Sequence, residues 1–344
     1  GSATFVTSGK AIDKINLASV KFGRTDMQGT VNLESEDWTE YQLKGKSLDL
    51  SDIWSRFSND DNKEISTERK ETPKFRLFLN FDKLWLRKDQ PLLNVVGSLS
   101  RRGDLWQSVY LHGDVSKKGS VDIALYESDK NTRTLSVLSD DAGATLRALD
   151  HYDNMLGGKL KISGTYDDTD LDSPLTARLK IDDYRIIKAP VLAKIVSILS
   201  ITGIIESLQG RGLSFSSMEV PFVSQRGTVS FKDARASGPS LGFTAEGKIY
   251  THAEVLNLEG TVVPAYLINS FFGQIPLLGD LFTGGTKGGG IFAANYKMTG
   301  PVENPVVSVN PLTALAPGIF RNFFDIFKKN SPTPEPEPTV GDGT

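Results

Sequence analysis

The chain has 344 residues, with 39 lysines and arginines against 42 aspartates and glutamates and a formal net charge of -3. This balance argues against a nucleic-acid partner, because such proteins need a basic surface to neutralise phosphates. The absence of cysteine excludes disulfides, thiol catalysis and cysteine-rich zinc sites, and it is compatible with the cytoplasm or with a bacterial periplasm. The opening Gly-Ser, residues 1–2, is typical of a cloning scar, so we expect the sequence to be a fragment of a longer chain.

Alternation of apolar and polar residues is the dominant local pattern, and it is typical of strands with one buried face. The clearest examples are segments 74–82, 120–127 and 158–166. Their apolar positions include Leu77, Leu79, Ile123, Leu125 and Leu160. Similar runs occur near 14–22, 26–34, 92–100, 106–112, 174–182, 227–235, 241–250 and 255–263. Because turn sequences separate these runs, the sequence predicts an antiparallel meander whose apolar face must be covered.

Four segments have helical features. Residues 140–156 have apolar residues at roughly helical spacing, and Gly157 and Gly158 would end a helix there. Residues 190–208 begin with a proline suited to a first turn and are apolar on nearly all sides, which favours a buried helix. The other two segments are residues 265–282 and 312–329. Residues 331–344 are rich in proline and glutamate, so a disordered tail is expected.

About a dozen strands and only four helices leave a long apolar face with little to cover it. Such a sheet either closes into a barrel or folds over as a trough that holds something else. We therefore expect a mainly β protein, with a long curved antiparallel sheet that forms an apolar groove capped by a few amphipathic or buried helices.

The sequence holds few groups that could do chemistry. His112, His151 and His252 lie far apart in different predicted elements, and none has a metal-ligand neighbour at helical spacing. Ser240 stands in a Gly-x-Ser-x-Gly pattern, but the residues after it alternate like a strand where a hydrolase needs a helix. A hairpin turn is therefore the favoured interpretation of this motif, and a serine hydrolase is a weak alternative.

Two loop motifs also fall short of a site. Residues 279–286 resemble a phosphate loop, but Gly285 stands where the loop needs a lysine. Residues 168–174 begin like a calcium loop, yet Ser173 and Leu179 replace the required glycine and glutamate. We expect no catalytic residue, no metal site and no cofactor, and a protein that is not an enzyme.

Residues 260–279 form an uncharged run that has the length of a membrane-spanning helix, but Pro264 and Pro276 argue against a span. The apolar residues of the segment 265–282 crowd around helix breakers, which favours a short broken helix along an apolar edge. Its candidate residues for contact with lipid or membrane are Phe271, Phe272, Ile275, Leu277 and Leu278.

The residues from Pro317 onwards predict an amphipathic helix. One stripe carries Ile319, Phe320, Phe323 and Phe327, and charged residues lie opposite. Two interpretations stay open: the stripe packs on the domain's own sheet, or it dips into the surface of a bilayer.

Residues 225–325 resemble a known family. The segments "GPSLGFTAEGKI", "LNLEGTVVPAYLINSFFGQIPLLGDLFTGG" and "GIFAANYKMTGPVENPVVSVNPLTALAPGIFR" are similar to the C-terminal region of AsmA-like envelope proteins, which include the long YhdP- and TamB-like chains of Gram-negative bacteria. The Val-Pro, Ile-Pro-Leu-Leu-Gly and Val-Asn-Pro-Leu blocks come in the family's order. Over residues 1–185 the resemblance is one of pattern only, as hairpins of a groove.

The resemblance implies that residues 3–186 form the hairpins of a β-groove and residues 187–330 an AsmA-like C-terminal domain. It implies a periplasmic protein, anchored in the inner membrane by a segment outside this sequence, that conducts phospholipids to the outer membrane without catalysis. The apolar strand residues named above would line the groove, and the C-terminal end would meet a membrane surface or an outer-membrane protein.

An alternative stays open, in which the protein is a periplasmic assembly or docking factor for outer-membrane proteins. An outer-membrane barrel is a weaker option, because lipid-facing aromatic girdles are not evident in the sequence.

Overall fold

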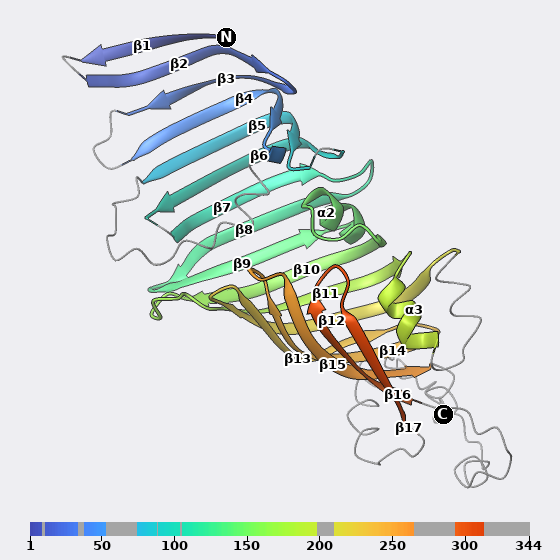
Figure 1. Cartoon of the computed structure of the whole chain (residues 1–344). Helices are drawn as coiled ribbons and strands as arrows, with labels where there is room; N and C mark the ends of the chain where they lie inside the picture. The colour runs from blue at the N-terminus through green and yellow to red at the C-terminus, as the bar shows by residue number, and fades with distance from the viewer. Residues whose placement is uncertain are drawn as a thin grey trace, which may run out of the picture.

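The computed structural model describes residues 1–8, 11–33, 38–52, 74–87, 89–103, 105–197, 210–264 and 293–312. Within these ranges the chain is mainly β, with short helices α2 (Ala142–Ala148) and α3 (Pro190–Ser197) (Figure 1). The strands are β1 (Ser2–Ser8), β2 (Ala11–Phe22), β3 (Thr25–Asn32), β4 (Thr39–Asp49), β5 (Phe75–Trp85), β6 (Pro91–Arg102), β7 (Leu105–Asp114), β8 (Ser120–Asp129), β9 (Thr132–Ser139), β10 (Met155–Asp167), β11 (Leu175–Ile186), β12 (Leu213–Gln225), β13 (Thr228–Ser237), β14 (Leu241–Tyr250), β15 (Val255–Pro264), β16 (Ala293–Pro301) and β17 (Val306–Leu312).

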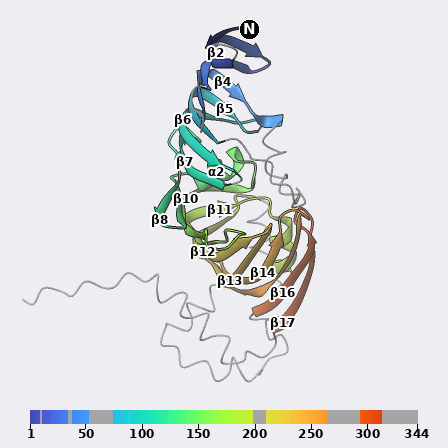
Figure 2. The same ribbon diagram turned by 90° about the vertical axis from the view of Figure 1, so that its left-hand side faces the viewer.

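All the strands belong to one sheet in which each strand pairs with the strands before and after it in the chain. The sheet is long, curved and unclosed, with β1 at one end and β17 at the other (Figures 1 and 2). The prediction of a mainly β, curved sheet is therefore confirmed, and closure into a barrel does not occur among these strands.

One pair departs from the predicted antiparallel meander. β4 and β5 are parallel, with Tyr41 opposite Leu77. Parallel neighbours need a crossover of about a dozen residues or more, and residues 50–74 between these strands are long enough to supply it. A sequence that alternates in both strands cannot reveal this change of direction.

The ends of the strands form two long rims that differ in their connections. We call turn rim the side with the β6–β7, β8–β9, β10–β11, β12–β13, β14–β15 and β16–β17 connections, which are all short. We call helix rim the opposite side, where α2 joins β9 to β10 and α3 follows β11 (Figure 1). β15 and β17 also end at the helix rim.

The structure corrects one predicted helix and contains the first part of another. The helix expected over residues 140–156 ends at Ala148, and Met155 begins β10. Gly157 and Gly158 have positive φ values of 64° and 90° inside that strand, so they bend a strand and do not end a helix. The helix expected over residues 190–208 is seen as α3 up to Ser197, beyond which lie residues outside the described ranges.

The remaining two predicted helices are not tested by the structure. The segment 265–282 lies outside the described residues, and so does 312–329 apart from Leu312, which ends β17. In the parts of the chain that are described, no helix has the length and apolarity needed to cross a membrane.

Candidate functional site: the apolar face of the sheet

An unbroken row of uncharged, mostly apolar residues runs across all the strands of the sheet. Each member lies opposite the next one in the strand register, from β1 to β17. The row, which we call the apolar row, consists of Phe5, Ile15, Val31, Tyr41, Leu77, Leu99, Val109, Leu125, Leu135, Gly164, Ala177, Phe222, Phe231, Gly247, Leu258, Met298 and Val307, its one hydroxyl being that of Tyr41. Because side chains alternate between the faces of a strand, these residues define one face, the apolar face.

The five strand residues singled out in the sequence all lie on this face. Leu77 and Leu125 are members of the apolar row itself. Leu79 is two residues from Leu77, and Ile123 is two residues from Leu125. Leu160 belongs to a second row, which lies nearer the helix rim. This row consists of Val121, Ser139, Leu160, Ile181, Met218, Ala236, Phe243, Val262 and Ala294.

Burial on the apolar face is graded from one rim to the other. Near the helix rim, Phe81, Val121 and Ile181 are at most 1% exposed. Near the turn rim, Leu77 and Leu99 on the neighbouring strands are only half-buried. At the first strand Phe5 is 60% exposed. The face is therefore sealed along the helix rim and less covered along the turn rim and at β1.

Close packing of α2 accounts for much of this seal. Gly143 lies so near the Met155 backbone that a Cβ there would overlap the Met155 carbonyl oxygen. Thr145 is fully buried and shares a 2.6 Å hydrogen bond with the Ser139 hydroxyl. The Asp141 carboxylate caps the helix by accepting a hydrogen bond from the Ala144 N–H at 3.0 Å.

A cluster of charges ties the loop after α2 to the loop between β5 and β6. Arg87 lies 3.1 Å from Asp89, 3.1 Å from Asp150 and 2.5 Å from Asp153. It also donates a hydrogen bond to the Arg147 carbonyl oxygen. The hydrogen bond from Arg87 lowers the pKa of the Asp153 carboxyl, so that this aspartate is held in its charged form.

The turn rim is held by a different arrangement around a buried arginine. Arg133 is 7% exposed and donates two hydrogen bonds to the Asp168 carboxylate, at 2.7 and 2.8 Å. Its guanidinium also bonds the Trp106 carbonyl oxygen and lies 4.5 Å from the centre of the Tyr166 ring. These hydrogen bonds lower the pKa of Asp168, although partial burial opposes the shift.

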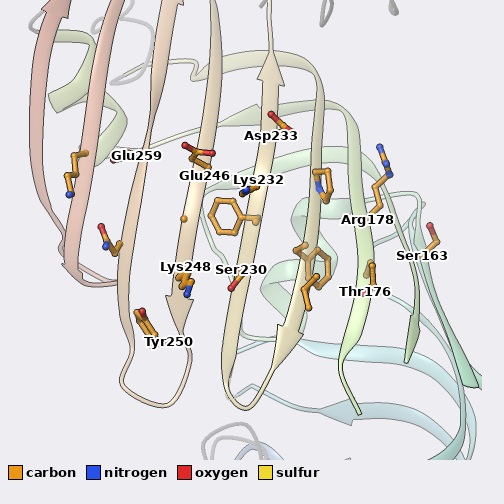
Figure 3. Close-up of a pocket in the computed structure, with 18 residues that line it drawn as sticks. Ser163, Thr176, Arg178, Ser230, Lys232, Asp233, Glu246, Lys248, Tyr250 and Glu259 are labelled. Carbon is orange, nitrogen blue, oxygen red and sulfur yellow. The ribbon is translucent and has the colours of Figure 1, made fainter. Parts of the chain in front are cut away.

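The opposite face of the sheet carries a shallow depression of about 1160 Å³ (Figure 3). Its lining residues on β11, β13 and β14 include Arg178, Lys232, Glu246 and Lys248, at positions that alternate with those of the apolar face. Positive and negative side chains are interspersed there, and β13 is bulged beside Asp233, whose φ is 54°. The depression is therefore a mixed-charge surface, and four members of the apolar row, Ala177, Phe222, Phe231 and Gly247, also line it.

Two of the three weak motifs of the sequence fall in a turn or in ion pairs, and the third, residues 279–286, lies outside the described residues. Ser240 lies in the connection between antiparallel strands β13 and β14, as the hairpin interpretation predicts. In the aspartate-rich loop, Asp168 binds Arg133 and Asp172 pairs with Arg226 at 2.5 Å. Among the described residues no group of three or more histidine, aspartate or glutamate side chains is placed to hold a metal ion.

The histidines stay apart in the structure. His112 hydrogen-bonds Asp122 across β7 and β8 at 2.7 Å. His151 follows α2, and burial lowers its pKa. His252 lies in the turn after β14. No arrangement of a nucleophile with a base connects them within the described ranges.

The remaining candidate residues, in the segments 265–282 and 312–329, lie outside the described residues. Conversely, the sequence reasoning missed β1, β4, β9, β12, β16 and β17, which supply six members of the apolar row. In β12, "LSFSSMEVPFVSQ" does alternate, but serines interrupt its apolar face and Pro221 argues against a strand.

Searches of protein-family models, of curated proteins and of solved structures each returned no match for this chain. The family resemblance described above stays a hypothesis.

Proposed function

We propose that this protein is a non-enzymatic conduit for phospholipids between the inner and outer membranes of a Gram-negative cell, in which lipid tails lie against the apolar face of the sheet. The apolar row is the observation that carries this proposal. Every strand contributes to it and no charged side chain interrupts it, so a fatty tail that moves from β1 to β17 meets apolar surface at each step.

The dimensions of the sheet suit such a path. With strands roughly 4.8 Å apart, seventeen strands span roughly 75 Å. The hydrocarbon core of a bilayer is about 30 Å thick, so one lipid tail covers about 15 Å of this length. Several lipids could lie along the sheet at the same time, as a continuous path requires.

The energetics show why an apolar path matters. A two-chain phospholipid has about 30 methylenes, and each costs about 0.8 kcal/mol to expose to water. Full exposure would cost roughly 24 kcal/mol, which as a barrier allows about 10⁻⁵ transfers per second. A lining that stays in contact with the tails removes most of this barrier without any catalytic group.

The two C-terminal segments extend the proposal. β15 ends at Pro264 and β17 at Leu312, two strands apart on the helix rim, so residues 265–292 and 313–344 leave the sheet from neighbouring points. In the proposed conduit these apolar segments meet a membrane or a partner. Charged substitutions at Phe320 and Phe323 should then reduce liposome binding and leave the circular-dichroism spectrum of the sheet unchanged.

Docking of an outer-membrane protein is favoured by a different observation. The face opposite the apolar row carries six large apolar side chains that are 42–51% exposed, on β5 to β9. They are Phe78, Val96, Leu105, Tyr110, Tyr126 and Leu138. Exposed apolar patches of this kind mark interaction surfaces.

Substitutions at two neighbouring residues distinguish the conduit from the docking factor. Leu77 and Phe78 are adjacent in β5 and lie on opposite faces of the sheet. For a conduit, we expect purified protein to carry phospholipid detectable by native mass spectrometry, Leu77→Asp to lose most of it, and Phe78→Asp to keep it.

For a docking factor, we expect Phe78→Asp to lose binding to unfolded outer-membrane proteins while Leu77→Asp keeps it. The conduit is contradicted if purified protein carries no phospholipid. It is also contradicted if Leu77→Asp and Phe78→Asp take up lipid equally. Circular dichroism and a urea titration of each variant check that the sheet is intact.

A further inference from the structure

The face of the sheet opposite the apolar face, which we call the outer face, is apolar in its centre between β5 and β9. Ser98 on β6 lies between Phe78 on β5 and Tyr110 on β7 in the register, and Leu138 on β9 lies opposite Asp122 on β8. The exposed apolar side chains there, which we call the outer patch, are Phe78, Val96, Leu105, Tyr110, Tyr126 and Leu138. An exposed group of this kind on neighbouring strands marks an interaction surface.

Charged side chains of opposite sign border the outer patch on β4 and β5. The two strands are parallel, and Glu40 lies opposite Arg76 near the turn rim. Lys46 and Asp82 follow six positions further along these strands, on the same face and exposed to solvent. Within the described ranges none of these four side chains forms an ion pair, although Glu40 accepts a 2.7 Å hydrogen bond from Gln42.

Arg76 is held against an aromatic ring on the outer face. Its guanidinium carbon lies 4.7 Å from the ring centre of Trp38, and that of Arg102 lies 5.7 Å from the same ring. Stacking fixes the plane of a guanidinium and leaves its N–H donors free to meet a carboxylate. Tryptophan, tyrosine and arginine are the residues enriched at the energetic centres of protein interfaces, so the composition of this surface favours a protein partner.

The order of charges along β4 and β5 fits a second copy of the same chain. A two-fold axis that lies between two outer faces and runs across the strands places each strand over its own copy, with the direction reversed. Arg76 then faces Asp82 of the second copy, and Asp82 faces the other Arg76. Glu40 and Lys46 meet in the same reciprocal way, so this orientation brings opposite charges together at four places.

The other two-fold orientation leaves these charges without partners. An axis along the strands, through the middle of the surface, would place β4 over β9 of the second copy. The side chains of β9 on the outer face are Thr132, Thr134, Ser136 and Leu138, and none of them is charged. Charge complementarity therefore selects the axis that runs across the strands.

The size and net charge of the surface suit a dimer. Six strands and seven residues per strand cover roughly 29 by 24 Å, or roughly 700 Å² in each copy. Two copies then bury roughly 1,400 Å², within the range of about 1,200–2,000 Å² for stable interfaces. The charges are nearly balanced, so two copies do not repel each other: the outer face of β4 to β8 carries Lys44, Lys46, Arg76, Lys83 and Arg102 against Glu40, Asp82, Asp114 and Asp122.

We propose that two copies of this chain pair through their outer faces around a two-fold axis that runs across the strands, with the outer patch at the centre. The axis keeps the order from β1 to β17 running the same way in both copies. Both apolar faces then point away from the interface and stay accessible. The inference does not rest on the proposed function, because it uses the opposite face of the sheet.

Sedimentation velocity of the purified chain from about 1 to about 100 µM tests the pairing, and we expect the wild type to change from monomer to dimer over this range. Phe78→Asp puts a charge at the centre of the outer patch and should leave the protein monomeric. Leu77→Asp changes the neighbouring residue on the apolar face and should dimerise as the wild type does. Circular dichroism and a urea titration verify that each variant is folded.

Charge reversal tests the orientation of the two copies. Arg76→Asp brings like charges together at two symmetric places and should weaken dimerisation about a hundredfold, and Asp82→Arg should do the same. An equimolar mixture of these two variants should dimerise like the wild type, because both contacts between positions 76 and 82 again join opposite charges. Arg76→Asp/Asp82→Arg in one chain should also restore the dimer. Lys232→Asp, in the mixed-charge depression, serves as the control and should change nothing.

Several outcomes overturn the inference. A monomer at every concentration refutes the pairing, and a dimer that persists in both Phe78→Asp and Arg76→Asp must use another surface. Failure of the mixture to dimerise contradicts the axis across the strands. A monomer whose outer patch binds an unfolded outer-membrane protein assigns this face to that partner instead. None of these results affects the conduit, which the lipid content of the purified protein tests separately.

Discussion

The two rims of the sheet border the same apolar face and differ in how far they cover it. At the helix rim α2 packs against β10 at backbone distance, and the side chains beneath it are almost completely buried. At the turn rim the connections are short, the apolar residues are half-buried, and arginines with aromatic rings occupy the border. Packing therefore provides stability on one side, and the other side leaves apolar surface partly exposed to solvent.

The largest expected effect comes from comparing two substitutions to aspartate in β5, one nearer the helix rim and one nearer the turn rim. Phe81 is 1% exposed near the helix rim, so Phe81→Asp removes a buried ring and buries a charge, at a cost of about 5 kcal/mol or more. Leu77 lies on the same face near the turn rim and is half-buried, so Leu77→Asp should cost about 1 kcal/mol.

Urea titrations of the two variants measure this difference in the free energy of unfolding. Equal losses of stability would show that the difference in burial between the rims does not affect the free energy of unfolding.

Removal of the buried cation at the turn rim should have the next largest effect. Arg133→Ala leaves the Asp168 carboxylate with the Ser173 hydroxyl but without its cationic partner, which costs about 3 kcal/mol at neutral pH. Because the folded-state pKa of Asp168 is lowered, its contribution is present above the ordinary carboxyl pKa and is lost as the pH falls through the lowered value.

The stability difference between wild type and Arg133→Ala should therefore shrink as the solution becomes more acidic than about pH 4. Urea titrations at neutral and acidic pH test this, with Arg226→Ala as a control, because Arg226 pairs with Asp172 at the surface. A difference that stays constant with pH would contradict the role assigned to the Arg133–Asp168 pair.

A smaller effect on stability is expected from alanine substitutions at two glycines, one at each rim. Gly143→Ala should destabilise the protein by about 2 kcal/mol, because its methyl group would overlap the Met155 carbonyl oxygen. Gly103 in the β6–β7 turn has a φ of 61° and open space around it, so Gly103→Ala should cost only about 1 kcal/mol of backbone strain.

Thermal unfolding followed by circular dichroism compares the two alanine variants. A larger effect at Gly103 than at Gly143 would show that α2 is not packed as closely as the geometry indicates.

Much of the sheet could be predicted from local patterns. The alternation around Leu77, Ile123 and Leu160 identifies strands and places those residues on one face, because side chains alternate with a period of two along a strand. The sequence pattern does not identify β9 as a strand for a physical reason: Arg133 and Ser139 interrupt its apolar face, and their tertiary partners Asp168 and Thr145 satisfy these polar groups.

Other features depend on partners far away in the sequence. The parallel pairing of β4 with β5 is set by a connection that has no periodic pattern. The burial of Arg133 requires Asp168, 35 residues later, and the guanidinium cluster at Trp38 requires Arg76 and Arg102 from two later strands. No local window of the sequence contains both members of such a contact.

The sequence by itself determined that this protein is a ribbon of amphipathic strands with few groups for chemistry, because alternation and composition are local properties of the chain. Only the tertiary structure decided that the strands form one unclosed sheet with a single unbroken apolar row. It also decided that one rim is sealed by helices while the other carries stacked arginines. Strand register and long-range contact set these features, and both depend on residues that are distant in the chain and neighbours in space.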